Sequence, residues 1–193
     1  MGFTRAELEA HHGEAVPDLR GDEVRLLFVG INPSLWTAAA QAHFAHPGNR
    51  FYKALHAAGI TDFVIDVSDG YQEPEIAQVT SRGIAISNLV NRATARADEL
   101  GRDELVDGAR ALGGKVAAWR PEVVAFVGIT VYRIAYGAPK AAVGLQGETI
   151  ADARVWVLPN PSGLNAHYRL ADLARLYRQA AEDASLTLAP LRL

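Results

Sequence analysis

The chain of 193 residues contains no cysteine. This absence excludes disulfide bonds, zinc sites with thiolate ligands, cysteine nucleophiles and iron–sulfur clusters held by cysteine.

Long apolar runs are also absent. One of the longest, residues 123–129, is far too short to cross a bilayer. The first seven residues show no positive region followed by an apolar stretch, so they do not resemble a secretory signal. We therefore expect a cytoplasmic protein without membrane partners.

The third missing feature is an excess of positive charge. Lys and Arg number 19 against 22 Asp and Glu, which gives a formal net charge of −3. This balance argues weakly against a nucleic-acid partner, yet such partners are held by local clusters of Lys and Arg. Acidic residues gather in the ranges 7–23 and 62–75, so a basic face elsewhere remains compatible with the composition.

Length and patterning predict one domain over residues 1–193, with a core at about 24–184 and a lead-in at 1–23. Short apolar runs at 24–29, 83–89, 122–127 and 154–158 are typical of strands buried on both faces. Helical spacing of apolar residues follows at 50–58, 104–119, 130–135 and 165–184. The alternation predicts a three-layer α/β/α sandwich around a central, mainly parallel sheet of about four to five strands.

The residues that follow the four predicted strands are mainly neutral and polar. They are rich in Gly, Asn, Ser and Pro at 30–35, 87–92, 128–130 and 158–165. None of these segments offers a Ser-His-Asp set, a glycine-rich phosphate loop or paired carboxylates. Because parallel sheets bind ligands beyond the carboxyl ends of their strands, we expect a pocket of amide and hydroxyl groups there. Such groups suit the edge of a nucleobase.

Four motifs in these segments carry a family resemblance. They are Gly-Ile-Asn-Pro at 30–33, Phe-Ala-His-Pro-Gly-Asn-Arg-Phe at 44–51, the strand and turn at 83–92, and Asn-Pro-Ser-Gly-Leu at 160–164. Together they resemble the mismatch-specific uracil/thymine-DNA glycosylase family of the uracil-DNA glycosylase superfamily. The resemblance spans residues 24 to about 177. It implies a monofunctional glycosylase of base excision repair that flips a uracil-type base from G:U mismatches and leaves an abasic site. It also implies a monomer at the bacterial nucleoid that needs no cofactor.

By this resemblance Asn32 is the catalytic residue that positions the attacking water. An amide cannot be a strong base, so catalysis would depend on geometry and on stabilising the departing base. Taken alone, Asn32 before Pro33 is also typical of a helix N-cap, and the two roles are compatible.

The resemblance also assigns a base pocket. Phe44 would stack on the extruded base, while the Gly30–Ile31 backbone and the Asn88 amide would meet its Watson–Crick edge. Taken alone, Phe44 could be core packing and Asn88 a turn residue. Secondary contacts with the base or a phosphate are expected from Asn49 and Ser87. Two positions depart from the family pattern: Ser34 replaces a glycine, where its side chain would narrow the pocket or add a hydroxyl, and Asn91 replaces an acid.

The segment after the fourth predicted strand resembles the loop that enters the DNA stack. Leu164 would be the apolar wedge, flanked by Ser162 and Gly163, while Asn165 and His167 would face the opposite strand or its phosphates. A single exposed leucine, however, is also common without any function. Helix N-termini after Ser162 and Thr130 are further candidates for phosphate contacts.

A metal site is not expected, although His43 and His46 share a loop and His11 and His12 are adjacent. Their spacing, without cysteine or an ordered carboxylate nearby, is poor for a metal, and His46 is expected to form a structural hydrogen bond. Two alternatives remain. One is another branch of the superfamily, although the classical branch has an aspartate where Asn32 stands and the iron–sulfur branches are excluded by the lack of cysteine. A different class, a non-catalytic nucleic-acid- or nucleotide-binding α/β module, would need neither Asn32 nor the wedge.

Overall fold

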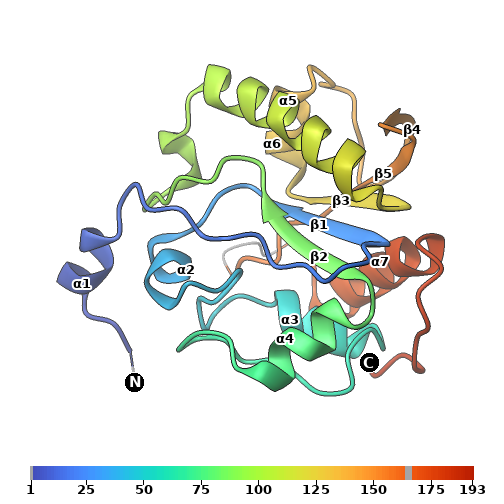
Figure 1. The fold of residues 1–193 in the computed structure, drawn as a ribbon, viewed down its shortest axis with the longest axis horizontal. Helices are drawn as coiled ribbons and strands as arrows, with labels where there is room; N and C mark the ends of the chain where they lie inside the picture. Colours follow the sequence, from blue (N-terminus) through green and yellow to red (C-terminus); the bar gives the residue numbers. More distant parts are fainter. Residues whose placement is uncertain (1, 164–166) are drawn as a thin grey trace.

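A five-stranded sheet forms the centre of the protein (Figure 1). In the computed structural model, which describes residues 2–163 and 167–193, the strand order is β2-β1-β3-β5-β4. Four strands are parallel, and β4 runs antiparallel to β5. The strands are β1 (Leu26–Gly30), β2 (Ile84–Asn88), β3 (Val123–Val127), β4 (Gly144–Ile150) and β5 (Ala153–Leu158).

Helices cover both faces of this sheet and confirm the predicted α/β/α layers (Figure 1). Within the described residues, none of them has the length and apolarity needed to span a bilayer. The helices are α1 (Arg5–Ala10), α2 (Leu35–Ala40), α3 (Phe51–Ala57), α4 (Glu73–Thr80), α5 (Arg102–Trp119), α6 (Ile129–Ala135) and α7 (Leu170–Asp183), with a 3₁₀ turn η1 (Ala97–Glu99).

The alternation of side chains along the central strand explains the two-sided core. In β1, Leu26 and Phe28 belong to the cluster shared with α3, α4 and α7, whereas Leu27 and Val29 belong to the cluster shared with α5 and α6. Successive side chains of a strand point to opposite faces, and all five residues of β1 are buried. The strand must therefore be apolar throughout, which is why it could be recognised in the sequence.

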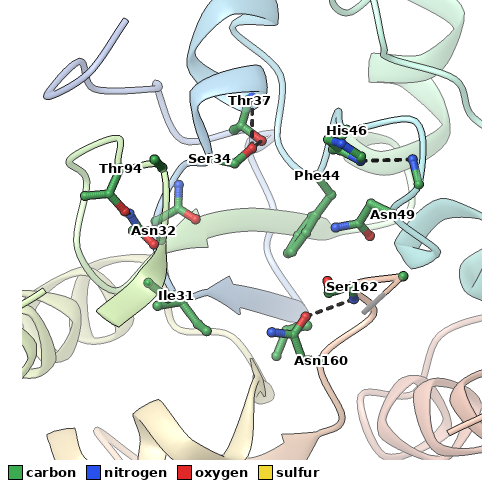
Figure 2. A pocket seen from close by; sticks show the side chains of 16 residues that line it. Ile31, Asn32, Ser34, Thr37, Phe44, His46, Asn49, Thr94, Asn160 and Ser162 are labelled. Carbon is green, nitrogen blue, oxygen red and sulfur yellow. Dashed lines mark hydrogen bonds between the residues drawn. The ribbon is translucent and has the colours of Figure 1, made fainter. Parts of the chain in front are cut away.

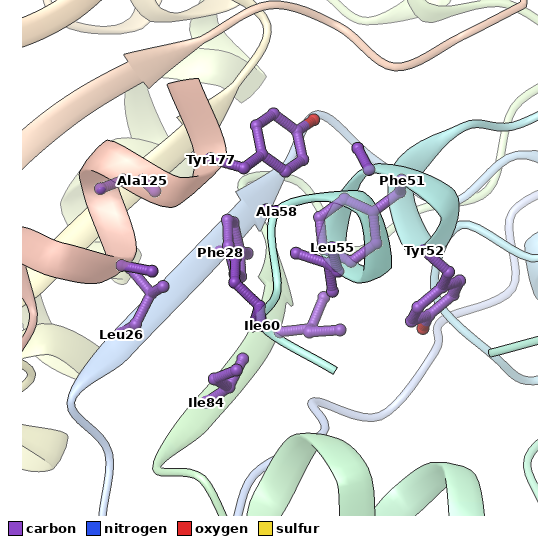
Figure 3. Packing of buried hydrophobic residues seen from close by; sticks show 14 of the residues in the cluster. Leu26, Phe28, Phe51, Tyr52, Leu55, Ala58, Ile60, Ile84, Ala125 and Tyr177 are labelled. Atoms are coloured by element: carbon purple, nitrogen blue, oxygen red, sulfur yellow. The ribbon is translucent and has the colours of Figure 1, made fainter. Parts of the chain in front are cut away.

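An aromatic cluster joins β1, α3 and α7 below the carboxyl end of the sheet (Figure 3). The ring of Phe51 meets Phe28 edge-on with centroids 5.2 Å apart, and the ring of Tyr177 lies 5.9 Å from Phe51 and 5.8 Å from Phe28. These three side chains are fully buried. They give the start of α3 a rigid support, and this matters because α3 follows the loop that carries Phe44.

Four elements differ from the sequence-based expectation. Strand β4 was not predicted because it is an edge strand whose polar side chains are largely exposed, so it lacks the apolar run of its neighbours. The short helices α2 and α4 were also missed. Of the expected helix over 165–184, the structure shows the part from Leu170 onward, because the described residues 167–169 are not helical.

The N-terminal segment packs against the free edge of β2. Leu19 forms an isolated antiparallel bridge with Ile86, in which each backbone N–H donates to the partner's carbonyl at 3.0 Å and 2.8 Å. The predicted capping box of Thr4 and Glu7 at the start of α1 is confirmed. The lead-in thus covers an edge that would otherwise expose unpaired backbone groups.

Candidate active site

A cavity of about 470 Å³ opens at the carboxyl ends of the parallel strands (Figure 2). The described residues that line it include no Asp, Glu, Lys or Arg. Its walls are amides, hydroxyls, small residues and aromatic rings, as the strand ends had suggested. The lining comprises Ile31, Asn32, Ser34, Thr37, Phe44, His46, Gly48, Asn49, Asn88, Thr94, Ala95, Ala97, Val127, Asn160, Ser162 and Gly163.

The orientation of the Asn32 amide follows from its neighbours. Its Nδ2 lies 2.8 Å from the Arg92 carbonyl, 2.8 Å from Thr94 Oγ1 and 3.1 Å from the Pro33 carbonyl. The Thr94 hydroxyl donates its hydrogen to the Arg96 carbonyl, so it meets Asn32 as an acceptor. Because all three neighbours accept, the NH₂ group must face them. The Oδ1 atom is then the part of the amide left to accept a hydrogen bond from a ligand or water.

The N-cap of α2 is Ser34 rather than Asn32. The Ser34 hydroxyl accepts from the Thr37 N–H at 3.1 Å and donates to Thr37 Oγ1 at 3.1 Å. The alternative interpretation of Asn32 as a cap is therefore wrong. Ser34 does line the cavity, as predicted, but its hydroxyl is engaged within α2.

Phe44 reaches into the cavity from a strained backbone position (Figure 2). It has φ of 56°, a left-handed conformation that is uncommon for an aromatic residue. Its ring stacks on Phe51 with centroids 4.0 Å apart and an interplanar angle of 21°. The half-buried Phe44 ring therefore has an aromatic support on one side while it lines the cavity, which is the arrangement that a stacking platform needs.

Two further asparagines of the lining use their side-chain oxygens locally. Asn49 Oδ1 accepts from the Phe51 N–H at 2.9 Å, and Asn160 Oδ1 accepts from the Ser162 N–H at 2.9 Å (Figure 2). For Asn49, which was predicted as a secondary contact, this leaves the NH₂ group as the part that can meet a ligand.

Ser87 does not line the cavity, in contrast to the predicted contact. It is fully buried, and its hydroxyl donates to Asp18 Oδ1 at 2.6 Å and accepts from Lys115 Nζ at 3.1 Å. Alternation along β2 explains this placement, because the neighbouring Asn88 points to the cavity side. Asn91 also lies outside the cavity lining, and its Oδ1 accepts from the Val16 N–H at 2.9 Å.

The loop after β5 is held by Arg50, a role that was not predicted from the sequence. The Arg50 guanidinium donates to the carbonyls of Pro161, Ser162 and Tyr168 at 3.3, 2.9 and 2.7 Å. Arg50 thereby ties together the two ends of the segment predicted to enter the DNA stack. Its position in the motif at 44–51 was the available signal, but carbonyl partners cannot be read from a sequence.

The predicted wedge segment is described only at its ends. Ser162 and Gly163 line the cavity, and a Cβ atom on Gly163 would lie 2.9 Å from the Gly48 carbonyl, so the two loops approach closely. His167 is exposed. Leu164 and Asn165 lie outside the described residues, and their assignment stays a prediction.

The histidines each have a protein partner. Nδ1 of His46 accepts from the Gly48 N–H at 3.0 Å, which agrees with the expected structural role. His11 pairs with Glu14 at 2.8 Å, and His12 pairs with Glu99 at 3.0 Å. No group of three or more potential metal ligands gathers in the part of the chain that the structure describes.

His43 is buried beside the cavity and makes the stability of the fold sensitive to acid. Burial lowers its pKa from the ordinary 6.5 to about 4, even though the hydrogen bond to Pro17 and the charge of Asp18 act in the opposite direction. Between these two pH values the unfolded chain binds a proton that the folded chain does not. His43 therefore costs no stability above pH 6.5, and its penalty grows as the pH falls toward 4.

We expect this penalty to reach roughly 3 kcal/mol at pH 4. Urea unfolding of the wild type and of His43→Phe, measured at pH 7 and at pH 4.5, would show it. The variant should lose less stability than the wild type over this interval, because it has no buried imidazole to protonate. Equal acid losses in the two proteins would contradict the prediction.

Gly30 illustrates how closely the cavity is packed. A Cβ atom at this position would lie 2.7 Å from Asn88 Oδ1 and 3.3 Å from Phe44 Cζ. We expect Gly30→Ala to displace the side chains of Asn88 and Phe44. The displacement should lower the rate of the reaction at this site by about 10- to 100-fold, the cost of a misplaced contact. Single-turnover kinetics would measure the loss. The matched control is Gly113→Ala in α5, where a Cβ atom meets nothing within 4 Å, and it should retain activity.

The chain is similar to known proteins in both sequence and fold. Residues 17–184 match the sequence profile of the uracil DNA glycosylase superfamily. The fold is similar to the solution structure of a Methanosarcina acetivorans protein described as a "putative Uracil DNA glycosylase". That similarity has a TM-score of 0.54 at 17% identity and covers 86% of this chain and 98% of the other.

Proposed function

Because this chain belongs to the uracil DNA glycosylase superfamily and is in that general sense a DNA glycosylase, we propose that it acts on uracil opposite guanine. The proposed enzyme is monofunctional. It extrudes uracil, or a related mismatched or damaged pyrimidine, from double-stranded DNA into the cavity. Water then attacks C1′ of the sugar, the N-glycosidic bond breaks, and the base departs with the bonding electrons, so that an abasic site remains.

The observation that carries this proposal is the fixed amide of Asn32 in a cavity whose described lining residues include no carboxylate. Its Oδ1 can accept a hydrogen bond from water and orient it, whereas an amide cannot remove the proton as a strong base would. The chemistry must then be driven by leaving-group departure and by positioning of the water. A hydrolysis that proceeds through loss of a stable base anion fits this arrangement.

The rest of the cavity has groups suited to a pyrimidine. The Phe44 ring, supported by Phe51, offers a stacking surface, and the buried Asn88 offers an amide to the base edge. The Ile31 carbonyl accepts from the Val90 N–H, whereas the Ile31 N–H forms no hydrogen bond with a described residue. That N–H can donate to a carbonyl oxygen of the departing base, where negative charge develops.

The preference for a mismatch follows from the cost of extrusion. Flipping a base from duplex DNA costs a few kcal/mol of pairing and stacking, and it costs less when the base is mismatched. The proposed wedge at Leu164 would offset part of the unstacking cost by entering the space that the base leaves.

A panel of single-lesion duplexes tests the proposed function. Uracil opposite guanine, uracil opposite adenine and thymine opposite guanine are incubated with enzyme in EDTA, and abasic sites are then revealed by alkaline strand cleavage. We expect cleavage at uracil opposite guanine first and fastest. The Gly113→Ala variant serves as a positive control for folding, and Asn32→Ala serves as the matched inactive variant.

Two outcomes would contradict the proposal. Binding of the uracil duplexes without any cleavage would favour the alternative of a non-catalytic nucleic-acid-binding module. Cleavage of uracil opposite adenine at the same rate as uracil opposite guanine would leave a glycosylase but remove the mismatch preference.

A further inference from the structure

The buried His43 has a defined tautomer. Its Nε2 lies 3.0 Å from the Pro17 carbonyl oxygen, which can only accept, so Nε2 must carry the hydrogen. Its backbone is also held, because the His43 N–H donates to Tyr71 Oη and the His43 carbonyl accepts from Tyr52 Oη, both at 3.1 Å. The ring is neutral above a pH of about 4, since burial lowers its pKa. Nδ1 is consequently an acceptor at neutral pH.

This acceptor faces the Asn88 amide. Asn88 Nδ2 lies 3.4 Å from His43 Nδ1, so it is the NH₂ end of Asn88 that is directed to the histidine. The Oδ1 end lies on the other side, next to the Gly30 backbone, where a Cβ atom would approach it to 2.7 Å. Rotating the amide by 180° would place two acceptors, Oδ1 and Nδ1, against each other. The histidine thus distinguishes the two orientations of a side chain that lines the cavity.

The Pro17 carbonyl that sets the tautomer is itself anchored to β2. The next residue, Asp18, accepts from Lys115 Nζ at 2.7 Å and from the Ser87 hydroxyl at 2.6 Å. Leu19 is bridged to Ile86 through two backbone hydrogen bonds. The acceptor, the histidine and the amide are therefore fixed relative to the strand that carries Asn88.

Amide orientation has a direct chemical consequence for base choice. The edge of uracil presents an N3–H donor beside the O4 acceptor, whereas the edge of cytosine presents the N3 acceptor beside the N4 amino donor. An amide with its oxygen and nitrogen in fixed places can pair with one of these edges, and the reversed amide pairs with the other. An unconstrained amide would serve both.

On the premise of the proposed function, we propose that His43 is a positioning residue that fixes the Asn88 amide for uracil-type edges and against cytosine-type edges. It does not touch the reacting atoms. Its effect is exerted through Asn88, and it should appear mainly in the ratio of the two excision rates.

The test compares uracil and cytosine placed opposite an abasic-site analogue, so that neither base has a pairing partner to lose. Single-turnover rates are measured for the wild type and for His43→Phe, which keeps an aromatic ring but removes both nitrogens. We expect the uracil-to-cytosine rate ratio to fall on the order of 10- to 100-fold in the variant, the range of discrimination that one paired edge supplies. His56→Phe, which changes a half-buried histidine in the last turn of α3, should leave the ratio unchanged.

A second measurement does not depend on how the variant folds. Nitrogen-15 NMR of the wild-type histidines reports which ring nitrogen is protonated. We expect the Nε2–H tautomer for His43 at pH 7, and an Nδ1–H tautomer would overturn the inference. Wild-type uracil excision with an unchanged ratio in a folded His43→Phe would also overturn it while leaving the proposed function intact. Absence of any wild-type excision would overturn the proposed function itself and the selectivity with it.

Discussion

Asn32→Ala is expected to slow base excision by about 10²- to 10³-fold under single-turnover conditions, as when one preorganised polar group is removed from an active site. The reason is geometric. Three acceptors hold the Asn32 NH₂ group, so Oδ1 is delivered to the cavity in one orientation, and alanine removes the only part of the side chain that can position water. Binding of uracil-containing duplex, measured by fluorescence anisotropy, should survive because the proposed base contacts lie elsewhere.

Asn32→Asp provides a sharper comparison. A carboxylate is a better base than an amide, but here it would face the carbonyls of Arg92 and Pro33 without a hydrogen to donate. We therefore expect Asn32→Asp to lose stability and to fail to exceed the wild-type rate at pH 7. Near-normal excision by Asn32→Ala would refute the role of Asn32 in positioning water. A stable Asn32→Asp variant that excises faster than the wild type would refute the inference that the neighbours of Asn32 require an NH₂ donor.

Phe51→Ala is expected to lower the free energy of unfolding by about 3–5 kcal/mol, the usual cost of removing a buried aromatic ring. Phe51 is fully buried and contacts Phe28 and Tyr177 in the core as well as Phe44 in the cavity (Figure 3). Removing its ring leaves a cavity beneath Phe44 and takes away the surface on which that ring rests. Urea unfolding gives the stability, and excision at a temperature where the variant stays folded gives the activity.

The more conservative Phe51→Leu separates these two effects. It keeps most of the buried volume, so it should be more stable than Phe51→Ala, yet it lacks the flat ring that stacks on Phe44. We expect Phe51→Leu to lose a larger fraction of the excision rate than of the free energy of unfolding. Phe63→Ala is the control, because Phe63 is 38% exposed and its truncation should cost clearly less stability than truncation of the fully buried Phe51. A Phe51→Ala protein as stable as this control would contradict the packing described here.

The fold was largely predictable because its main signals are local. All residues of β1, β2 and β3 are buried, and apart from Ser87 and Asn88 at the end of β2 they are apolar or glycine, so each strand stands out in the sequence as a short apolar run. Strand β4 gave no such signal, because an edge strand with exposed side chains has no need of apolar residues. The start of α7 was placed too early because the polar residues before Leu170 resemble a helix start as closely as they resemble a loop.

The candidate site also has features that could be predicted from the sequence and features that only the tertiary structure decided. The residue types at the strand ends determined that a neutral pocket of amides would form there, because parallel strands bring their carboxyl ends to one edge whatever the detailed packing. The direction in which Asn32 presents its amide, the turning of Ser87 away from the cavity, and the link from Pro17 through His43 to Asn88 were decided only by the tertiary structure. Each depends on a partner distant in the chain, such as Arg92 for Asn32 or Asp18 for Ser87. An amide or an imidazole has two hydrogen-bonding orientations of nearly equal intrinsic energy, and the acceptors that folding places beside it choose between them.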